Sequence, residues 1–241
     1  DRYMITSASN NTIKALIKLK QKKYRDETGY YLVEGEHLVE EAMKAKQVEC
    51  LISTKDITSD LPIIVVSNEV MSKLSFTKSP QSIMAKCKIK KEKKLIDGKR
   101  YLILDDLQDP GNIGTLIRTA LAFSIDQVIL SNNCVDLYND KLLRSMQGAN
   151  FHISCIYDDL KTVISTLKKN NVKIIGSALE NGQDIKQIKI SEKMAFIVGN
   201  EGNGMNKDIL QECDYVGYIP INTIESLNVA IAGSIMMYYF K

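Results

Sequence analysis

Three segments of the sequence, 105–120, 199–205 and 220–229, carry side chains that can bind or orient a ligand, and the first two also contain glycine. The first carries an arginine, the second a glutamate between glycines, and the third a serine and an asparagine. Glycine allows a backbone to approach a ligand closely, and a guanidinium binds phosphate through charge-assisted hydrogen bonds. These residue types favour the positioning of a ligand beside a charged partner.

The first segment contains Asn112 and, six residues later, Arg118. Pro110-Gly111 predicts a turn, and Asn112 is a candidate N-cap of the helix that follows. Six helical residues turn by about 600°, so the two side chains lie about 120° apart around the axis. They do not share a face, but both can border a pocket at the start of the helix. The alternative interpretation is that Arg118 is an ordinary exposed helix charge.

The second segment places Glu201 among Gly199, Gly202 and Gly204. It matches neither G-x-G-x-x-G nor a phosphate-binding loop, because no basic residue follows. A glycine-rich turn without a ligand is the alternative interpretation.

The third segment predicts a helix start with Ser226 as candidate N-cap. Small residues in that helix indicate close packing, either within the chain or against a second subunit.

The elements around these segments alternate between short apolar strands and helices. After residue 98, the predicted strands are Tyr101–Leu104, Gln127–Leu130, Ile153–Ile156, Val172–Ser177, Ala195–Val198 and Tyr215–Ile219. The predicted helices are Ile113–Phe123, Asp140–Met146, Leu160–Lys169, Lys207–Glu212 and Ser226–Tyr239. This alternation predicts a mostly parallel sheet with helices on both faces. Ligands of such sheets bind at the carboxyl ends of the strands, where all three segments lie.

The residues before the charged run Lys88–Lys94 predict a smaller α/β unit. Its predicted strands are Tyr30–Val33, Val48–Ser53, Leu61–Val66 and Ser82–Ile89, and its predicted helices are Asn10–Lys20 and Glu36–Lys46. The charged run and the Asp97-Gly98 pair after it predict a linker near residues 90–98. A solvated strand end is the alternative interpretation of the same charges.

The charge is unevenly distributed along the chain. Residues 1–97 contain 18 Lys and Arg against 13 Asp and Glu, whereas residues 98–241 contain 14 against 16. A basic N-terminal part suggests a module that binds a polyanion.

No stretch approaches the roughly 18 apolar residues of a membrane span, and the first residues lack the pattern of a secretory signal. We therefore expect a cytoplasmic protein that does not cross a membrane.

The five cysteines are scattered without a C-x-x-C pair, and the chain has only two histidines. This spacing fits neither a disulfide framework nor a zinc site, so we expect reduced thiols and no metal centre. A nucleotide-dependent oxidoreductase is disfavoured, because the glycine fingerprint after the first strand and its acidic partner are missing.

In this order, the three segments resemble the three signature motifs of the SpoU (TrmH-like) class of SPOUT RNA methyltransferases. The matching stretches are Asn112-x-Gly114-x3-Arg118-Thr119-Ala120, Val198-Gly199-Asn200-Glu201-Gly202-x-Gly204, and Ile219-Pro220 through Ser226-Leu227-Asn228-Val229. The third departs from the family, because Asn222-Thr223 stands where a glycine is usual and the stretch is one residue short. The resemblance covers residues 101–239.

Residues 5–89 resemble an L30e-like RNA-binding domain through Lys22-Lys23-Tyr24-Arg25 and Glu34-Gly35, with Ser82 at a position where relatives commonly have glycine. The implied fold class is α/β: a C-terminal SPOUT α/β-knot, with a deep trefoil knot and a mostly parallel sheet, preceded by a small L30e-like domain. Such a knot is a rare exception to the rule against threaded chains. The implied domains are an RNA substrate-binding domain, 1–95, and a methyltransferase domain, 96–241, that forms a homodimer through the knot.

The resemblance further implies methylation of a ribose 2′-hydroxyl of RNA with S-adenosylmethionine as donor. Ribosomal RNA is favoured as substrate, with transfer RNA as the alternative substrate. An alternative function is that of a non-catalytic RNA-binding protein on the same scaffold. The implied cofactor-binding residues are Ser177, Ala178, Leu179, Gly199, Asn200, Gly204, Ile219, Ile221, Ser226 and Leu227. The implied catalytic residues are Asn112, Arg118, Glu201, Ser226 and Asn228.

The resemblance gives Arg118 a role at the acceptor, where it would pair with an RNA phosphate and help to deprotonate the 2′-hydroxyl. A guanidinium with a pKa above 12 is rarely neutral, so a clamp on the phosphate is the alternative role. The other residues expected to bind RNA are Lys20, Lys22, Lys23 and Arg25.

Overall fold

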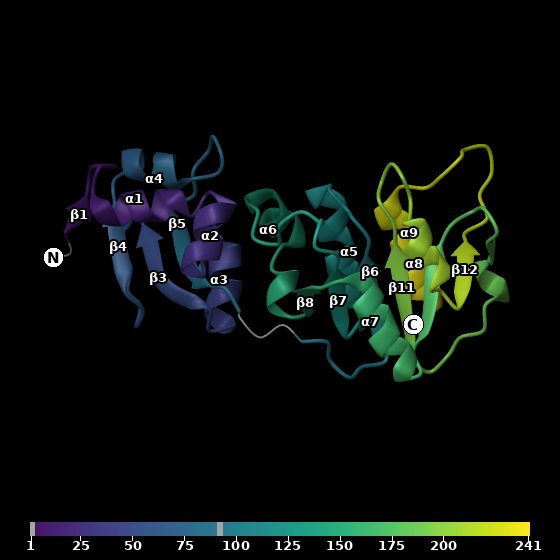
Figure 1. Ribbon diagram of the computed structural model, residues 1–241. Helices are drawn as coiled ribbons and strands as arrows, with labels where there is room; N and C mark the ends of the chain where they lie inside the picture. The colour runs from purple at the N-terminus through teal and green to yellow at the C-terminus, as the bar shows by residue number, and fades with distance from the viewer. Residues whose placement is uncertain (1–2, 91–93) are drawn as a thin grey trace. The chain divides into compact units, whose positions relative to one another are not determined.

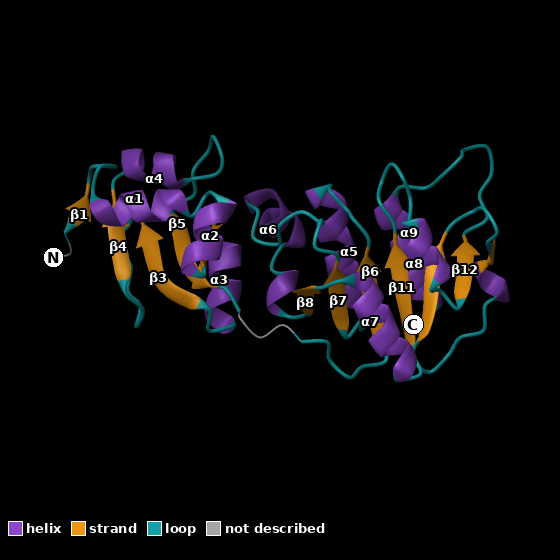
Figure 2. Cartoon of the chain, viewed as in Figure 1, coloured by secondary structure: helices purple, strands orange, loops and turns teal. Residues whose placement is uncertain are grey.

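The computed structural model describes residues 3–90 and 94–241, which form two units (Figures 1 and 2). Among these residues, the first unit contains 3–90 and 136–151, and the second contains 94–135 and 152–241. Residues 136–151, which the sequence prediction assigned to the C-terminal domain, pack in the first unit, and the predicted division into domains 1–95 and 96–241 stays a prediction. The predicted linker and the start of the chain lie partly outside the described residues.

The first unit is built on a five-stranded sheet in the order β1-β4-β3-β5-β2. Strand β5 runs antiparallel to β2 and β3, whereas β1 and β3 run parallel to β4. The strands are β1 (Met4–Ile5), β2 (Tyr30–Glu34), β3 (Val48–Ser53), β4 (Ile63–Val66) and β5 (Ile83–Lys88). The helices are α1 (Asn11–Lys18), α2 (Lys22–Thr28), α3 (Glu36–Lys44), α4 (Asn68–Leu74), α6 (Asp140–Met146) and the 3₁₀ turn η1 (Ala149–Phe151).

Helices α1 and α4 cover one face of this sheet. Ile13 and Leu16 of α1 share a core with Val70 and Leu74 of α4 and with Ile52 of β3. Sequence patterns predicted α1 and α3 but not α2 or α4, which span seven residues each. Short helices depend on tertiary packing more than on their own propensity.

RNA binding would require Arg25 to lie on the surface, but its side chain is buried. Its side chain is 7% exposed, and its guanidinium donates to Asp136 at 2.7 Å and to the carbonyl of Leu19 at 3.1 Å. Asp136 stands 111 positions away in the sequence, so local spacing could not reveal this pair. The ion pair therefore gives Arg25 a structural role in the first unit.

The second unit contains a seven-stranded sheet in the order β10-β12-β9-β11-β6-β7-β8, with every described pair parallel. The strands are β6 (Arg100–Leu104), β7 (Gln127–Leu130), β8 (Ser154–Tyr157), β9 (Lys173–Ser177), β10 (Gln183–Asp184), β11 (Met194–Val198) and β12 (Tyr215–Tyr218). The helices are α5 (Pro110–Ala122), α7 (Leu160–Lys169), η2 (Ile185–Gln187), α8 (Lys207–Gln211) and α9 (Val229–Tyr239).

Helices cover both faces of the parallel sheet, which confirms the predicted α/β class. On one face, Val163 and Leu167 of α7 pack with Ile197 of β11. On the other, Phe240 at the end of α9 stacks on Phe196 of β11 with ring centroids 5.4 Å apart. The trefoil knot stays a prediction. None of the described helices is both long and apolar enough to span a lipid bilayer.

We predict that Asp136→Ala lowers the free energy of unfolding by about 3 kcal/mol, because it leaves the Arg25 guanidinium buried without its counter-charge. The control is Asp26→Ala, which removes the exposed Lys22–Asp26 pair, whose side chains are 61% and 58% exposed. That change should cost less than about 1 kcal/mol. Urea unfolding followed by circular dichroism measures both; equal losses would contradict the assignment.

Candidate active site

The first two motif segments meet because the strands before them are neighbours. Strand β6 pairs with β11 in parallel, and Leu104 lies opposite Val198 at their carboxyl ends. The next residue, Asp105, donates its backbone N–H to the carbonyl of Val198 at 2.9 Å. The loops that follow therefore start side by side.

Glu201 fastens the glycine loop to the first segment. Its carboxylate accepts the backbone N–H of Asp109 at 2.9 Å and that of Gln108 at 3.2 Å. Asn200 adds a second link, since its side-chain N–H donates to the carbonyl of Asp106 at 2.7 Å. Glu201 thus orders the backbone before α5, where a negative charge is also favoured by the helix dipole.

Within the glycine loop, Asn200 also organises the turn. Its backbone exchanges two hydrogen bonds of 3.0 Å with Gly204, and its side-chain oxygen accepts the N–H groups of Gly202 and Asn203. Gly199 is required by space, because a Cβ atom there would lie 2.4 Å from the backbone nitrogen of Met205. The glycine pattern therefore encodes a compact loop with fixed backbone.

The helix caps differ from those predicted. Asp109, not Asn112, is the N-cap of α5, and its carboxylate accepts the N–H of Asn112 at 2.8 Å. Asn228, not Ser226, is the N-cap of α9. Asn112 and Asn228 instead pair with each other, since the Asn228 amide donates to the Asn112 side-chain oxygen at 3.0 Å. This bond joins the first segment to the third.

The three segments line one pocket of about 1000 Å³ in the second unit. It contains every residue predicted to bind the cofactor, together with Asn112, Glu201 and Asn228. Lining residues that sequence reasoning missed are Gly202, Gly217, Tyr218, Pro220, Ile224, Glu225, Val229, Ala232 and Met236. Most follow directly from the motif positions, but Ala232 and Met236 face the pocket only because α9 packs beside it.

Arg118 does not line this pocket. It is exposed on α5 and forms no hydrogen bond or ion pair with the described residues. Six residues of helix separate it from Asn112, which corresponds to about 9 Å along the axis. The guanidinium is therefore free to bind a partner outside the pocket.

The lysines predicted to bind RNA have different surroundings in the first unit. Lys22 is exposed and pairs with Asp26 at 2.6 Å, and Lys23 lies over the ring of Tyr24 at 5.4 Å. The Lys20 ammonium instead donates to two backbone carbonyls, so it is engaged within the protein. Lys22 and Lys23 thus remain candidates for phosphate contacts, whereas Lys20 has a structural role.

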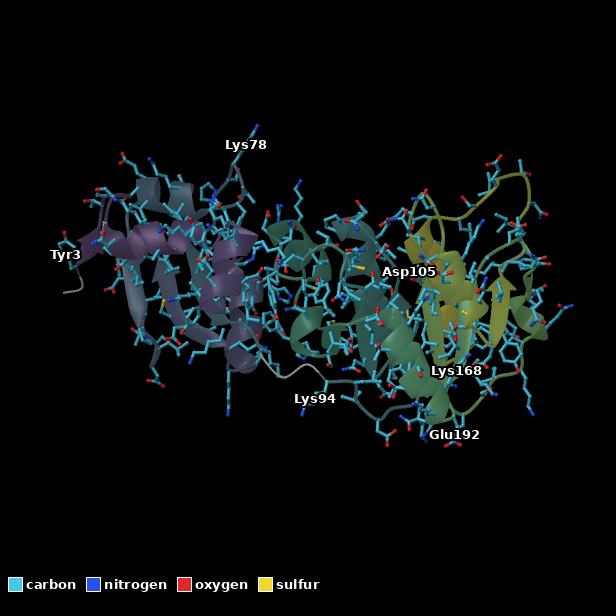
Figure 3. The ribbon with its side chains drawn as sticks, viewed as in Figure 1. Tyr3, Lys78, Lys94, Asp105, Lys168 and Glu192 are labelled. Atoms are coloured by element: carbon cyan, nitrogen blue, oxygen red, sulfur yellow. The ribbon has the colours of Figure 1, made fainter. Side chains whose placement is uncertain are left out.

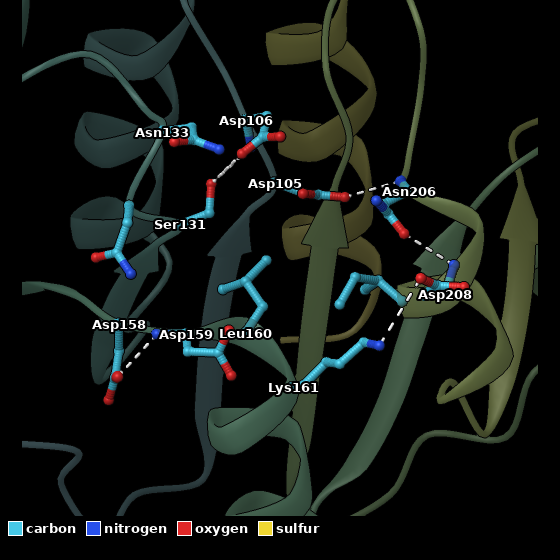
Figure 4. Close-up of a pocket in the computed structure, with 12 residues that line it drawn as sticks. Asp105, Asp106, Ser131, Asn133, Asp158, Asp159, Leu160, Lys161, Asn206 and Asp208 are labelled. Atoms are coloured by element: carbon cyan, nitrogen blue, oxygen red, sulfur yellow. Dashed lines mark hydrogen bonds and ion pairs between the residues drawn. The ribbon is translucent and has the colours of Figure 1, made fainter.

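A second hollow of about 240 Å³ opens where β6, β7 and β8 end (Figure 4). Asp105 lies beside it, 5% exposed, and accepts the N–H of Asn206 at 2.9 Å. Burial raises the pKa of the Asp105 carboxyl above its usual range. Asp105 therefore supports the far end of the glycine loop.

No group of three or more His, Cys, Asp or Glu in the described parts of the chain could hold a metal ion.

The shortened third motif contains a strained turn. Thr223 has a φ of 75°, in the left-handed region that favours glycine, and the N–H of Ile224 donates to the carbonyl of Asn222 at 2.8 Å. This is a γ-turn of the strained kind, and a β-branched residue at its centre adds to the cost. Threonine therefore occupies a conformation that the usual glycine of the motif would adopt freely.

Comparisons with known proteins agree with this geometry. The SpoU rRNA methylase family matches residues 99–238, and an MRM3-like substrate binding domain matches residues 10–85. A similar protein is the 23S rRNA (guanosine(2553)-2′-O)-methyltransferase RlmP of Bacillus subtilis, 42% identical over 98% of both chains. A similar structure is the AdoMet-bound rRNA methyltransferase of Sinorhizobium meliloti, 27% identical, with a TM-score of 0.88 over 98% of this chain and 96% of that one.

The SpoU methyltransferase AviRb of Streptomyces viridochromogenes shares the fold, with a TM-score of 0.86 over 95% of this chain and 96% of that one at 20% identity. Fold and pocket thus define one class of enzyme, the SPOUT methyltransferases. The chain belongs to the SpoU rRNA methylase family. The family predicted from the three motifs is confirmed.

We predict that Thr223→Gly raises the free energy of unfolding by about 1 kcal/mol, because relief of the strained φ exceeds the added chain entropy of glycine. Asn222→Gly is the control, since Asn222 is outside the positive-φ region and should gain nothing. Thermal and urea unfolding compare the three proteins. A Thr223→Gly protein no more stable than wild type would show that relief of the strained φ does not exceed the entropic cost of glycine.

Proposed function

We propose that the chain transfers a methyl group from S-adenosylmethionine to the ribose 2′-hydroxyl of a guanosine in 23S ribosomal RNA. The observation that carries the proposal is the closure of three motif segments around one pocket. The choice of RNA and nucleotide is supported by the activity in the name of the Bacillus subtilis relative. Relatives whose names mention transfer RNA as well as ribosomal RNA are less similar to the chain, at 29% to 34% identity.

The lining of the pocket suits the donor chemically. Leu179, Ile221 and Leu227 offer apolar surface for an adenine ring, and the backbone of the glycine loop offers hydrogen-bonding groups. Glu225 also lines the pocket and forms no hydrogen bond or ion pair with described residues, so its charge is available to a cationic ligand. When bound, S-adenosylmethionine supplies a methyl group on a positively charged sulfur. Transfer then depends chiefly on in-line positioning of the acceptor.

The residues at the mouth of the pocket would position the acceptor. Asn112 and Asn228 form a fixed amide pair there, whose remaining hydrogen-bonding capacity can orient a ribose. Arg118 would clamp a neighbouring phosphate through its guanidinium fork. In this role it holds the 2′-oxygen toward the pocket, and the hydroxyl proton passes to solvent water as the methyl group is transferred.

The homodimer is proposed from an apolar face of α9. Ile231, Ile235 and Tyr238 are 50%, 38% and 58% exposed, and Leu121 of α5 is 37% exposed. The helix carries no charged residue along its length. Such a face favours burial against a second copy of the chain.

The first unit is proposed to bind the RNA, which the match to a substrate binding domain supports. Lys22 and Lys23 on α2 are the candidate phosphate contacts. A ribosomal RNA substrate also agrees with the expected cytoplasmic location. The five cysteines, which are free thiols in the structure, agree with that location as well.

We predict that Arg118→Ala lowers turnover at least about a hundredfold while the S-adenosylmethionine dissociation constant changes less than twofold, because the side chain lies outside the pocket. Mapping of 2′-O-methyl sites on 23S ribosomal RNA measures transfer, and calorimetry measures donor binding. Arg144→Ala, an exposed arginine on α6, is the control and should retain activity. Loss of less than tenfold in Arg118→Ala would remove Arg118 from the reaction.

We also predict that Ile235→Glu converts the protein to a monomer, because a charge would have to be buried in the proposed interface. Ile190→Glu, which changes an apolar side chain of similar exposure outside α9, should leave the dimer intact. Analytical ultracentrifugation distinguishes the two. A wild-type protein that sediments as a monomer at micromolar concentration would refute the homodimer.

A further inference from the structure

The loop between α4 and β5, residues 75–82, is held in place by a carboxylate of the first unit. Glu34, at the end of β2, accepts the Ser75 hydroxyl at 2.5 Å and the backbone N–H groups of Phe76 and Gln81, each at 3.1 Å. Both ends of the loop are therefore tied to one side chain.

Lys20 fixes the same loop from α1. Its ammonium donates to the carbonyl of Ser75 at 2.8 Å and to that of Lys73 at 3.2 Å, and it lies over the Phe76 ring at 5.5 Å. A surface loop with this many fixed contacts loses little entropy when a ligand binds. Loop 75–82 is thus preorganised, although the turnover chemistry described above makes no use of it.

A pocket of about 380 Å³ opens beside this loop, within the first unit. It is lined by Thr54, Lys55, Asn68, Met71, Ser72, Pro80, Gln81 and Ser82. Met71 is 1% exposed and provides an apolar base, whereas most of the other lining residues are polar. The volume is within the range of about 300–1,000 Å³ that is usual for small-ligand sites.

Three side chains of the lining have unused hydrogen-bonding groups. Lys55, Asn68 and Gln81 are exposed, and none forms a side-chain hydrogen bond or ion pair with the described residues. A side-chain amide both donates and accepts, as the edge of a nucleobase requires, whereas an ammonium donates to phosphate. Lys78 adds positive charge at the tip of the loop, where it projects away from the ribbon (Figure 3).

We propose that this pocket binds one unpaired nucleotide of the RNA substrate, with the base edge at Asn68 and Gln81 and a phosphate at Lys55. Proteins recognise RNA sequence mainly at unpaired nucleotides, because the base edges in a duplex are occupied or inaccessible. The lining contains no aromatic residue, so hydrogen bonds rather than stacking carry the recognition. The proposal depends on the proposed function for the identity of the ligand as RNA.

The test uses the full chain and two variants, Asn68→Ala/Gln81→Ala and Lys55→Ala. The probe is a labelled 23S ribosomal RNA fragment that spans the nucleotide corresponding to guanosine 2553, and fluorescence anisotropy gives its affinity. Each variant should bind this fragment about tenfold more weakly. Lys55→Ala should also lower the slope of log affinity against log salt by about one. A fully paired RNA duplex should bind all proteins equally.

Two controls match these changes elsewhere on the surface. Lys14→Ala removes an exposed lysine of α1, and Gln187→Ala removes an exposed amide of η2. Both should bind the fragment as the wild type does. Because the altered side chains make no contacts described above, all variants should unfold within about 2 °C of the wild type.

The outcomes separate this proposal from the proposed function. Unchanged affinity in both pocket variants, or an equal loss of affinity for the duplex, overturns the nucleotide pocket even if the wild type methylates the RNA. Weaker binding of the fragment by the variants, together with a wild type that transfers no methyl group, supports the pocket and overturns the methylation. A wild type that does not bind the fragment overturns both.

Discussion

The parallel pairing of β6 with β11 places the backbone of two distant segments side by side, and the Glu201 carboxylate then joins them. Unpaired N–H groups before a helix require acceptors, and Glu201 satisfies those of Gln108 and Asp109. One side chain therefore stabilises the start of α5 and links the glycine loop to it. A third segment completes the wall of the pocket beside these two segments.

That wall is the third segment, which is fixed at the start of α9. Asn228 caps the helix and also donates to Asn112, so a single amide serves both the fold and the mouth of the pocket. Further along α9, a Cβ atom at Gly233 would lie 2.6 Å from the Leu116 side chain, which shows how closely α9 packs on α5. Glycine at position 233 is thus explained by packing within the chain.

In the first unit, too, one carboxylate orders a loop by accepting its backbone N–H groups. Glu34 binds backbone N–H groups of residues 76 and 81, as Glu201 does for residues 108 and 109. A carboxylate accepts several N–H groups at once, so one acidic residue can order a loop that has little core of its own. Both loops lie next to pockets, where fixed backbone lowers the entropy lost on binding.

The sequence by itself determined the parallel sheet and the three segments that meet at the large pocket, but only part of the pocket lining. Its apolar strands alternate with helices, and loops after parallel strands must meet at one edge. Only the tertiary structure decided the roles of single polar groups. Asp109 rather than Asn112 caps α5, and Arg25 is buried against Asp136. Such choices depend on partners brought together from distant positions, and local spacing carries no information about those partners.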